Sequence, residues 1–167
     1  NYLLPTWDNI TGQMAAIALL AADRHRRIEG EGQLVKIALK DVAVATTSNL
    51  GNISEVLING EDREKNGNYL YGAFGRDFET KDNKRLMIVG LTPKQWASIV
   101  SATESEEEIV ALEVSTGLDF TKEGDRFKAK EALAKILEPW FKSRGYEEAC
   151  AFLDKHAVCY GPYRTFK

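Results

Sequence analysis

The stretch that decides the fold is residues 5–22, which reads PTWDNITGQMAAIALLAA. Every residue from Met14 to Ala22 is apolar, so the helix that it predicts has no polar face and should be buried on most sides. The apolar run is too short to cross a bilayer. Asp8 stands ahead of the run, where a carboxylate can cap the helix that follows. The alternative is that Asp8 is a catalytic carboxylate, whose charge the amides at the helix N-terminus stabilise.

The residues after this helix continue the pattern of a layered α/β domain. The helix should run to about Ile28 and end at Gly30, because glycine readily closes a helix C-terminus. Residues 34–39 predict a short strand, apolar enough for the interior of a parallel sheet. Asp41 should cap a further helix over residues 42–50. Helix, glycine turn and strand in this order indicate the end of a doubly wound α/β unit.

The chain changes character after residue 50. Residues 60–68 read GEDREKNGN, a polar run with glycine near both ends that is typical of a surface loop. We therefore expect three parts. Residues 1–50 form the end of a large α/β domain, residues 51–68 form a linker, and residues 69–167 form a small α+β domain.

The small domain should begin with a hairpin and continue with helices. A strand that ends near Phe78 and a strand over residues 85–90 are joined by a turn at Asp82-Asn83. Thr92-Pro93-Lys94-Gln95 has the form of a capping box with proline at the first helical position, and Trp96 in the helix that follows should face the core. The acidic run 104–108 should form the N-terminus of the next helix. Asp125 should cap the helix after it, which Pro139 should kink, and residues 146–155 should form the last helix.

Aromatic residues and glycines alternate in residues 69–78, which read YLYGAFGRDF. One interpretation is an edge strand with a bulge at Gly72 or Gly75. The other is a loop that closes over a substrate, since glycines let backbone amides approach an oxyanion and aromatic rings exclude water. The two interpretations remain open at this point.

Composition excludes several classes of function. The formal net charge is −3, which does not favour nucleic acid or an anionic membrane as a partner. No signal peptide or transmembrane run is present. Cys150 and Cys159 predict two buried free thiols rather than a disulfide scaffold, which fits a reducing compartment, so we expect a cytoplasmic protein. The acidic run 104–108 is better explained as a helix N-terminus than as a metal site, and we expect no metal.

An ordered set of motifs resembles the family III CoA-transferases, the family that also contains the α-methylacyl-CoA racemases. The motifs are Asp8-x-x-x-Gly12, the Ala/Leu-rich helix, residues 24–27 and 30–33, Asp41, and residues 71–74, 92–96 and 158–162. The resemblance covers nearly the whole chain. It implies the end of a Rossmann-like large domain followed by a small α+β domain, within an interlocked homodimer. Members of the family are more than twice as long, so we expect a central fragment that alone is inactive.

The same resemblance implies the chemistry. Asp8 matches the aspartate that attacks an acyl-CoA thioester to give a mixed anhydride and then an aspartyl-CoA thioester. The substrates would be an acyl-CoA and a small carboxylic acid, with coenzyme A entering as a thioester substrate rather than as a permanently bound cofactor. The expected substrate and oxyanion loop consists of Tyr71, Gly72, Phe74, Gly75 and Arg76.

Residues 67–78 are similar to the corresponding stretch of mesaconyl-CoA C1–C4 CoA transferases, a group within the family that moves CoA between two carboxylates of one acid. In such a reaction Arg76 could clamp the second carboxylate, because its planar fork pairs with carboxylates in a bidentate way. The alternative for Arg76 is a surface ion pair with Asp77 or Glu79.

Two other functions stay open. The chain could belong to a racemase, in which the same Asp8 acts as a general base on the α-carbon of an acyl-CoA. It could also be a noncatalytic fragment or a module for dimerisation.

Overall fold

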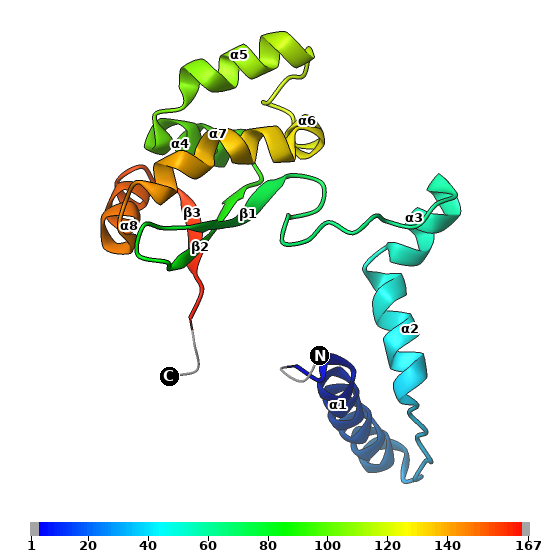
Figure 1. The fold of residues 1–167 in the computed structure, drawn as a ribbon. Helices are drawn as coiled ribbons and strands as arrows, with labels where there is room; N and C mark the ends of the chain where they lie inside the picture. Colours follow the sequence, from blue (N-terminus) through cyan, green and yellow to red (C-terminus); the bar gives the residue numbers. More distant parts are fainter. Residues whose placement is uncertain (1–3, 165–167) are drawn as a thin grey trace. The chain divides into compact units, whose positions relative to one another are not determined.

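The computed structural model describes residues 4–164, which fold into two compact units with a boundary between Glu64 and Lys65 (Figure 1). Each unit has its own internal packing and is described by itself. The boundary falls inside the segment 51–68 that the sequence predicts to connect two domains.

The first unit consists of three helices, with no strand in its described part. They are α1 (Thr6–Glu29), α2 (Leu39–Asn49) and α3 (Asn52–Asn59). The predicted end of α1 is confirmed, because Gly30 has a left-handed conformation with φ of 79° and its N–H donates to the Arg26 carbonyl. Asp8 lies in the first turn of α1 and Arg26 and Arg27 lie in its last turn, so both ends carry charges that oppose the helix dipole.

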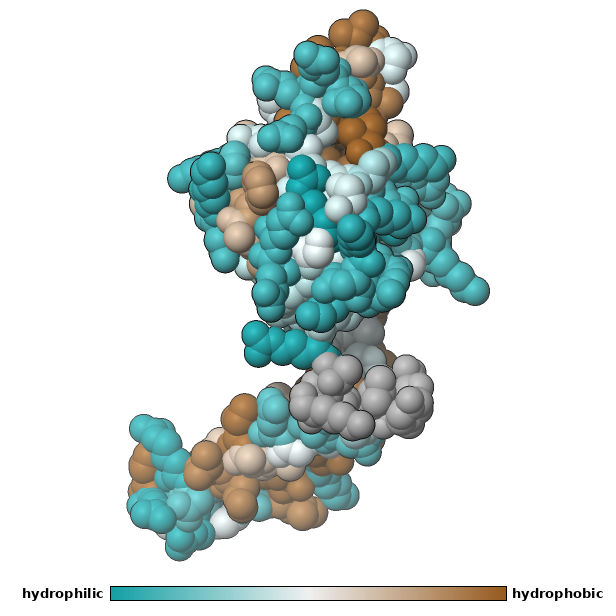
Figure 2. Space-filling view, turned by 60° about the vertical axis from the view of Figure 1, so that its left-hand side comes forward, coloured by the Kyte–Doolittle hydropathy of each residue, from teal (hydrophilic) through white to brown (hydrophobic). Residues whose placement is uncertain are grey.

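The prediction that α1 is buried on most sides is wrong for this structure. No residue of α1 is buried, and Leu19 and Leu20 are each 70% exposed. Figure 2 shows apolar side chains at the surface of this unit, in the lower part of the view. Burial needs a second surface, and within the described part of the unit α2 is the main element that packs on α1.

The predicted strand over residues 34–39 does not form. Residues 31–38 have no regular structure, and Leu39 is already the first residue of α2. An isolated extended segment is not stable as a strand, because its backbone groups need partners on a neighbouring strand. The described residues of this unit contain no such strand.

The predicted helix caps at Asp8 and Asp41 are also wrong. Pro5 occupies the N-cap position of α1 and Ala38 that of α2, and neither helix has a side-chain capping bond. Each aspartate instead lies inside the first turn, where its charge still interacts favourably with the helix dipole. Asp41 lies 3.8 Å from the ammonium of Lys40.

The second unit is built on an antiparallel sheet with the strand order β1-β2-β3. The strands are β1 (Phe74–Glu79), β2 (Arg85–Gly90) and β3 (Cys159–Pro162). The predicted hairpin between β1 and β2 is confirmed. Its residues pair one to one from Phe74 opposite Gly90 to Glu79 opposite Arg85, so β1 has no bulge over this range. The edge strand predicted from residues 69–78 therefore begins at Phe74 and is regular.

Five helices follow or flank the sheet, mostly above it in Figure 1. They are α4 (Pro93–Thr103), α5 (Glu106–Thr116), α6 (Glu123–Lys128), α7 (Lys130–Lys142) and α8 (Tyr146–Lys155). The predicted capping box at the start of α4 is confirmed, with both reciprocal bonds between Thr92 and Gln95. Pro139 lies inside α7 without ending it, and the break falls at Ala129 instead. Asp125 is inside α6 rather than at its N-cap.

One face of the β1–β2 hairpin packs against α4 and α7 and forms the core. Phe78 of β1 stacks on Phe141 of α7 with ring centroids 4.5 Å apart, and Trp96 of α4 contacts Phe74 at 5.2 Å. The prediction that Trp96 is a core residue is confirmed. Other members of this core are Leu86, Ile88, Ile99, Leu133, Leu137, Ala149 and Leu153.

A buried carboxylate lies on the opposite face of β1. Asp77 is 2% exposed, accepts a hydrogen bond from Asn68 and forms an ion pair with Arg85. Burial alone raises the pKa of the Asp77 carboxyl, but the hydrogen bonds from Asn68 and Arg85 and the charge of Arg85 outweigh it and lower this pKa below its usual value. The folded state therefore gains stability from ionised Asp77 above the carboxyl's unfolded pKa, and loses it as the pH falls through the folded pKa.

We expect Asp77→Asn to lower the free energy of unfolding by about 1–3 kcal/mol at pH 7, because Arg85 loses its buried partner. The difference from the unchanged protein should shrink below about pH 4, because the unfolded Asp77 carboxyl then takes up a proton before the folded one does. Urea denaturation at pH 7 and at pH 3 measures both values. A difference that is the same at both pH values would contradict the account.

Candidate functional site

Asp8 lies in the first turn of α1, and its side chain is exposed. This exposure is compatible with a nucleophile, which must be accessible to its substrate. The other predicted site residues belong to the second unit, so the structure describes Asp8 and the predicted loop separately.

Tyr71 and Gly72 form a turn just before β1. Tyr71 is 46% exposed and its ring packs edge-on against Phe127 with centroids 5.0 Å apart. Gly72 has φ of 80°, a conformation that side chains strain, and the position that a Cβ would take is open. An exposed ring beside an open glycine turn is suited to contact a ligand.

Phe74 and Gly75 lie in tightly packed surroundings. Phe74 is fully buried in the core against Trp96. A Cβ at Gly75 would lie 3.0 Å from the Leu70 Cβ and 3.2 Å from the Ile88 carbonyl oxygen. The Gly75 carbonyl also accepts a hydrogen bond from the Leu70 N–H at 2.7 Å. The missing side chain at Gly75 thus lets the preceding loop fold closely onto β1.

Arg76 is half-buried and shares the helix-covered face of β1 with Phe74 and Phe78, since alternate residues of a strand face the same side. Its Nη1 donates to the Tyr69 hydroxyl at 3.0 Å and its Nε to the Asp77 carbonyl at 3.2 Å. The guanidinium carbon lies 5.1 Å from the Tyr69 ring centroid and 5.2 Å from that of Phe78.

The ion pair predicted as the alternative for Arg76 does not form. Arg85 takes both carboxylates, at Asp77 and at Glu79. Within residues 4–164 Arg76 forms no ion pair with a carboxylate, although its guanidinium rests on aromatic rings. Its charge is therefore available to a ligand.

Sequence reasoning missed a second cation beside the same ring. The Lys130 ammonium lies 5.9 Å from the Tyr69 ring centroid and 4.2 Å from that of Phe127. Lys130 is the first residue of α7, which packs on β1. No local motif marks it, because its approach to the Tyr69 ring depends on the way that α7 lies over the sheet.

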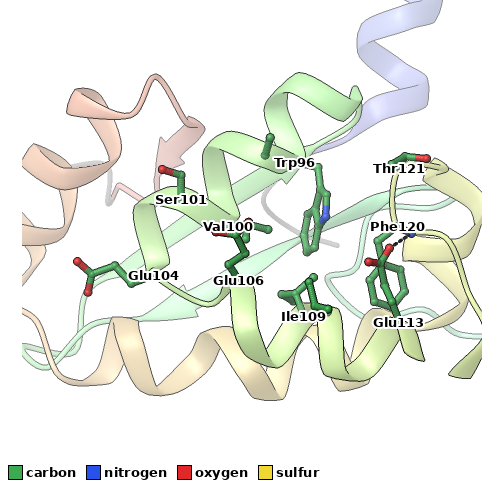
Figure 3. A pocket seen from close by; sticks show the side chains of 11 residues that line it. Trp96, Val100, Ser101, Glu104, Glu106, Ile109, Glu113, Phe120 and Thr121 are labelled. Atoms are coloured by element: carbon green, nitrogen blue, oxygen red, sulfur yellow. Dashed lines mark hydrogen bonds between the residues drawn. The ribbon is translucent and has the colours of Figure 1, made fainter. Parts of the chain in front are cut away.

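A groove between α4 and α5 lies elsewhere in the second unit. It has a volume of about 490 Å³, and Figure 3 shows Trp96 of α4 pointing toward Ile109 of α5 inside it. Three carboxylates, Glu104, Glu106 and Glu113, are among its lining residues, and that of Glu113 accepts a hydrogen bond from the Phe120 N–H. None of the predicted site residues lines this groove.

Other reactive side chains of the described chain do not form a recognisable site. Both cysteines are free, but Cys159 is exposed and not buried as predicted. On the surface, the Ser101 Oγ lies 3.0 Å from the His156 Nδ1. Residues 4–164 contain no cluster of side chains with the composition of a metal site, and none of their helices is both long and apolar enough to cross a membrane.

The fold matches that of solved proteins. Two crystal structures of Rv3272 from Mycobacterium tuberculosis superpose on 98% of this chain with TM-scores of 0.70 and 0.68, at 22% sequence identity. The match covers 40% and 41% of those chains. The class defined by the fold is thus a mixed helix and sheet protein with a small antiparallel sheet.

Sequence comparison identifies the family. The sequence model described as CoA-transferase family III matches residues 3–167, and the chain belongs to this family. It is 54% identical over its whole length to a 2-methylfumaryl-CoA isomerase of Chloroflexus aurantiacus. It is 26% identical over 134 residues to a succinyl-CoA:mesaconate CoA-transferase of Haloarcula hispanica. The resemblance found in the sequence is confirmed.

The chain spans 41% of the first of these relatives, and the match to the second covers 80% of this chain and 31% of that protein. The activity of the whole protein is therefore a matter for proposal.

We expect Gly75→Ala to destabilise the protein by about 1–3 kcal/mol, because the added methyl group meets Leu70 and the Ile88 backbone. Gly161→Ala is the matched control, since Gly161 also lies in a strand of the sheet and a Cβ there meets nothing within 4 Å. Urea denaturation of both variants measures the effect. Equal stabilities for the two variants would show that the close approach at Gly75 is unimportant.

Proposed function

We propose that the whole protein transfers CoA between two carboxylates through Asp8, and that it acts on the CoA thioester of 2-methylfumarate (mesaconate). Membership of CoA-transferase family III and the names of the two relatives support this substrate class. The observation that carries the proposal is Arg76, a half-buried guanidinium with no ion pair to a carboxylate within the described chain.

The reaction begins when an oxygen of Asp8 attacks the thioester carbonyl. The carbon–sulfur bond breaks, CoA leaves as a thiolate, and the acyl group stays on Asp8 as a mixed anhydride. The thiolate then attacks the Asp8 carbonyl, which releases the substrate carboxylate and leaves an aspartyl-CoA thioester. Each step exchanges one activated acyl group for another, so the reaction consumes no ATP and neither takes up nor releases a proton overall.

Transfer is completed by the second carboxylate of the same acid. It attacks the aspartyl-CoA carbonyl and expels the CoA thiolate, which leaves a second mixed anhydride. The thiolate then attacks the carbonyl of the acid in this anhydride. The acid now carries CoA on its second carboxylate, and the Asp8 carboxylate is regenerated. In this scheme coenzyme A enters and leaves as a substrate and is not a resident cofactor.

Residues of the second unit would hold the acid during this exchange. Arg76 binds the carboxylate that does not carry CoA, because its fork is planar and bidentate. The exposed ring of Tyr71 helps to exclude water, and the open turn at Gly72 allows a backbone amide to approach an oxyanion. Phe74 and Gly75 support this loop from within the core.

An inward-facing charge can also protect an edge strand from pairing with another chain. This structural explanation of Arg76 requires no ligand. The structural explanation predicts that a substitution of Arg76 lowers kcat/KM equally for monocarboxyl-CoA and dicarboxyl-CoA substrates, whereas the proposed function predicts a larger loss for the dicarboxyl-CoA substrate.

The proposal includes an interlocked homodimer of the whole protein. The apolar side chains on α1 are open in this chain, which is consistent with their being covered by further parts of the protein or by a second copy. Light scattering of the full-length protein tests this part of the proposal, and a monomer would contradict it.

We expect hydroxylamine to trap an acyl or CoA ester on Asp8 when the full-length protein turns over mesaconyl-CoA. The peptide that contains Asp8 should gain the mass of a hydroxamate, and Asp8→Asn should give neither the adduct nor CoA transfer. Mass spectrometry reads the result. Turnover without any adduct would contradict covalent transfer through Asp8, and no turnover would remove support for this substrate.

We expect Arg76→Gln to reduce kcat/KM for mesaconyl-CoA by at least about tenfold, because a charge-assisted bidentate contact is lost. The kcat/KM for a monocarboxyl-CoA thioester should change little. Arg164→Gln is the control, since Arg164 is an exposed arginine of the same unit. Equal losses with both substrates would support the structural explanation of Arg76.

A further inference from the structure

Lys130 lies in an environment that is unusual for a lysine. It is half-buried, and its ammonium is 4.2 Å from the Phe127 ring centroid and 5.9 Å from that of Tyr69. Cations rest favourably on aromatic faces, but this contact does not neutralise their charge. The ammonium therefore keeps its capacity to bind an anion.

Lysines nearby in the chain pair with carboxylates instead. Lys128 pairs with Asp125 at 2.7 Å, and Lys142 pairs with Glu138 at 3.0 Å along α7. Within the part of the chain that the structure describes, Lys130 forms no ion pair with a carboxylate. It is a partly desolvated cation without an internal counter-charge, as Arg76 is.

The two cations come from different elements to one aromatic ring. Arg76 extends from the edge strand β1 and donates to the Tyr69 hydroxyl, while Lys130 extends from the first turn of α7 and lies 5.9 Å from the same ring centroid. Two like charges near one ring repel each other, and an anion bound by both would offset this repulsion. We infer that Arg76 and Lys130 together form an anion site beside Tyr69, and that this site holds the free carboxylate of a dicarboxylic acyl-CoA.

The two side chains do different work in this site. The fork of Arg76 orients the carboxylate by two parallel hydrogen bonds, whereas Lys130 adds a point charge with freely rotating donors. Lys130 is thus a residue that determines specificity by favouring an acid with a second negative charge. This inference rests on the proposed function for the identity of the acid, but binding of a free dicarboxylate tests it without turnover.

The experiment uses the full-length protein and isothermal titration calorimetry with fumarate as the dicarboxylate probe and crotonate as the monocarboxylate. We expect Lys130→Gln to weaken fumarate binding roughly fivefold, the effect of losing one partly exposed charge contact. Crotonate binding should change less than twofold, because crotonate has no second carboxylate. High salt should reduce the difference in fumarate affinity between the unchanged protein and Lys130→Gln, since salt screens exposed charges.

Two further variants control for charge and packing. Lys135→Gln removes the same charge from an exposed position of the same helix and should leave fumarate binding unchanged. Lys130→Arg keeps the charge and should retain most of the affinity. If Lys130→Arg loses as much as Lys130→Gln, the residue acts through its packing on Phe127 and the inference is wrong.

Other results overturn the inference in identifiable ways. Equal fumarate affinity in Lys130→Gln and Lys135→Gln, or no measurable fumarate binding in the unchanged protein, removes Lys130 from the site. If Lys130→Gln weakens binding of free CoA but not of fumarate, the cations hold a CoA phosphate instead of a carboxylate. Loss of fumarate affinity in Lys130→Gln, together with an unchanged protein that transfers no CoA, would leave the anion site standing and refute the proposed function.

Discussion

One face of the β1–β2 hairpin is buried beneath α4 and α7, and the rest of the second unit is arranged around this contact. Phe78 stacks on Phe141 of α7, and Phe74 meets Trp96 of α4. Each fully buried side chain of this size contributes about 1.5–3 kcal/mol from burial. A small three-stranded sheet needs such a covering, because its strands alone bury too little apolar surface.

The same contact brings the proposed anion site together. Strand alternation places Arg76 between Phe74 and Phe78 on the covered face, so the guanidinium must lie under the helices or at their margin. Packing of α7 on β1 then brings Lys130 beside Tyr69. The charges that we propose as ligands for a carboxylate are therefore positioned by an apolar core, which limits how far they can move.

The first unit shows how secondary structure and burial can be separated. The helices α1 and α2 form close to where the sequence predicts them, and Gly30 ends α1 as expected, whereas α3 lies within the segment predicted as a linker. Its apolar side chains nevertheless remain open, and residues 34–39 do not pair. Helices satisfy their own backbone hydrogen bonds, whereas strands and apolar faces need partners, and the described part of this unit supplies few of them.

The sequence alone determined the features that depend on near neighbours in the chain. These are the capping box before Trp96, the glycine end of α1, the hairpin, and the ordered motifs that mark the family. It also singled out Asp8 and Arg76, but it assigned helix caps to aspartates that lie one turn further in. Only the tertiary structure decided that Gly75 serves a close backbone approach, that Arg85 takes the carboxylates expected for Arg76, and that Lys130 joins Arg76 at Tyr69. The physical reason is that these contacts join segments far apart in the chain, and the packing of α7 on the sheet, rather than any local pattern, sets their distances.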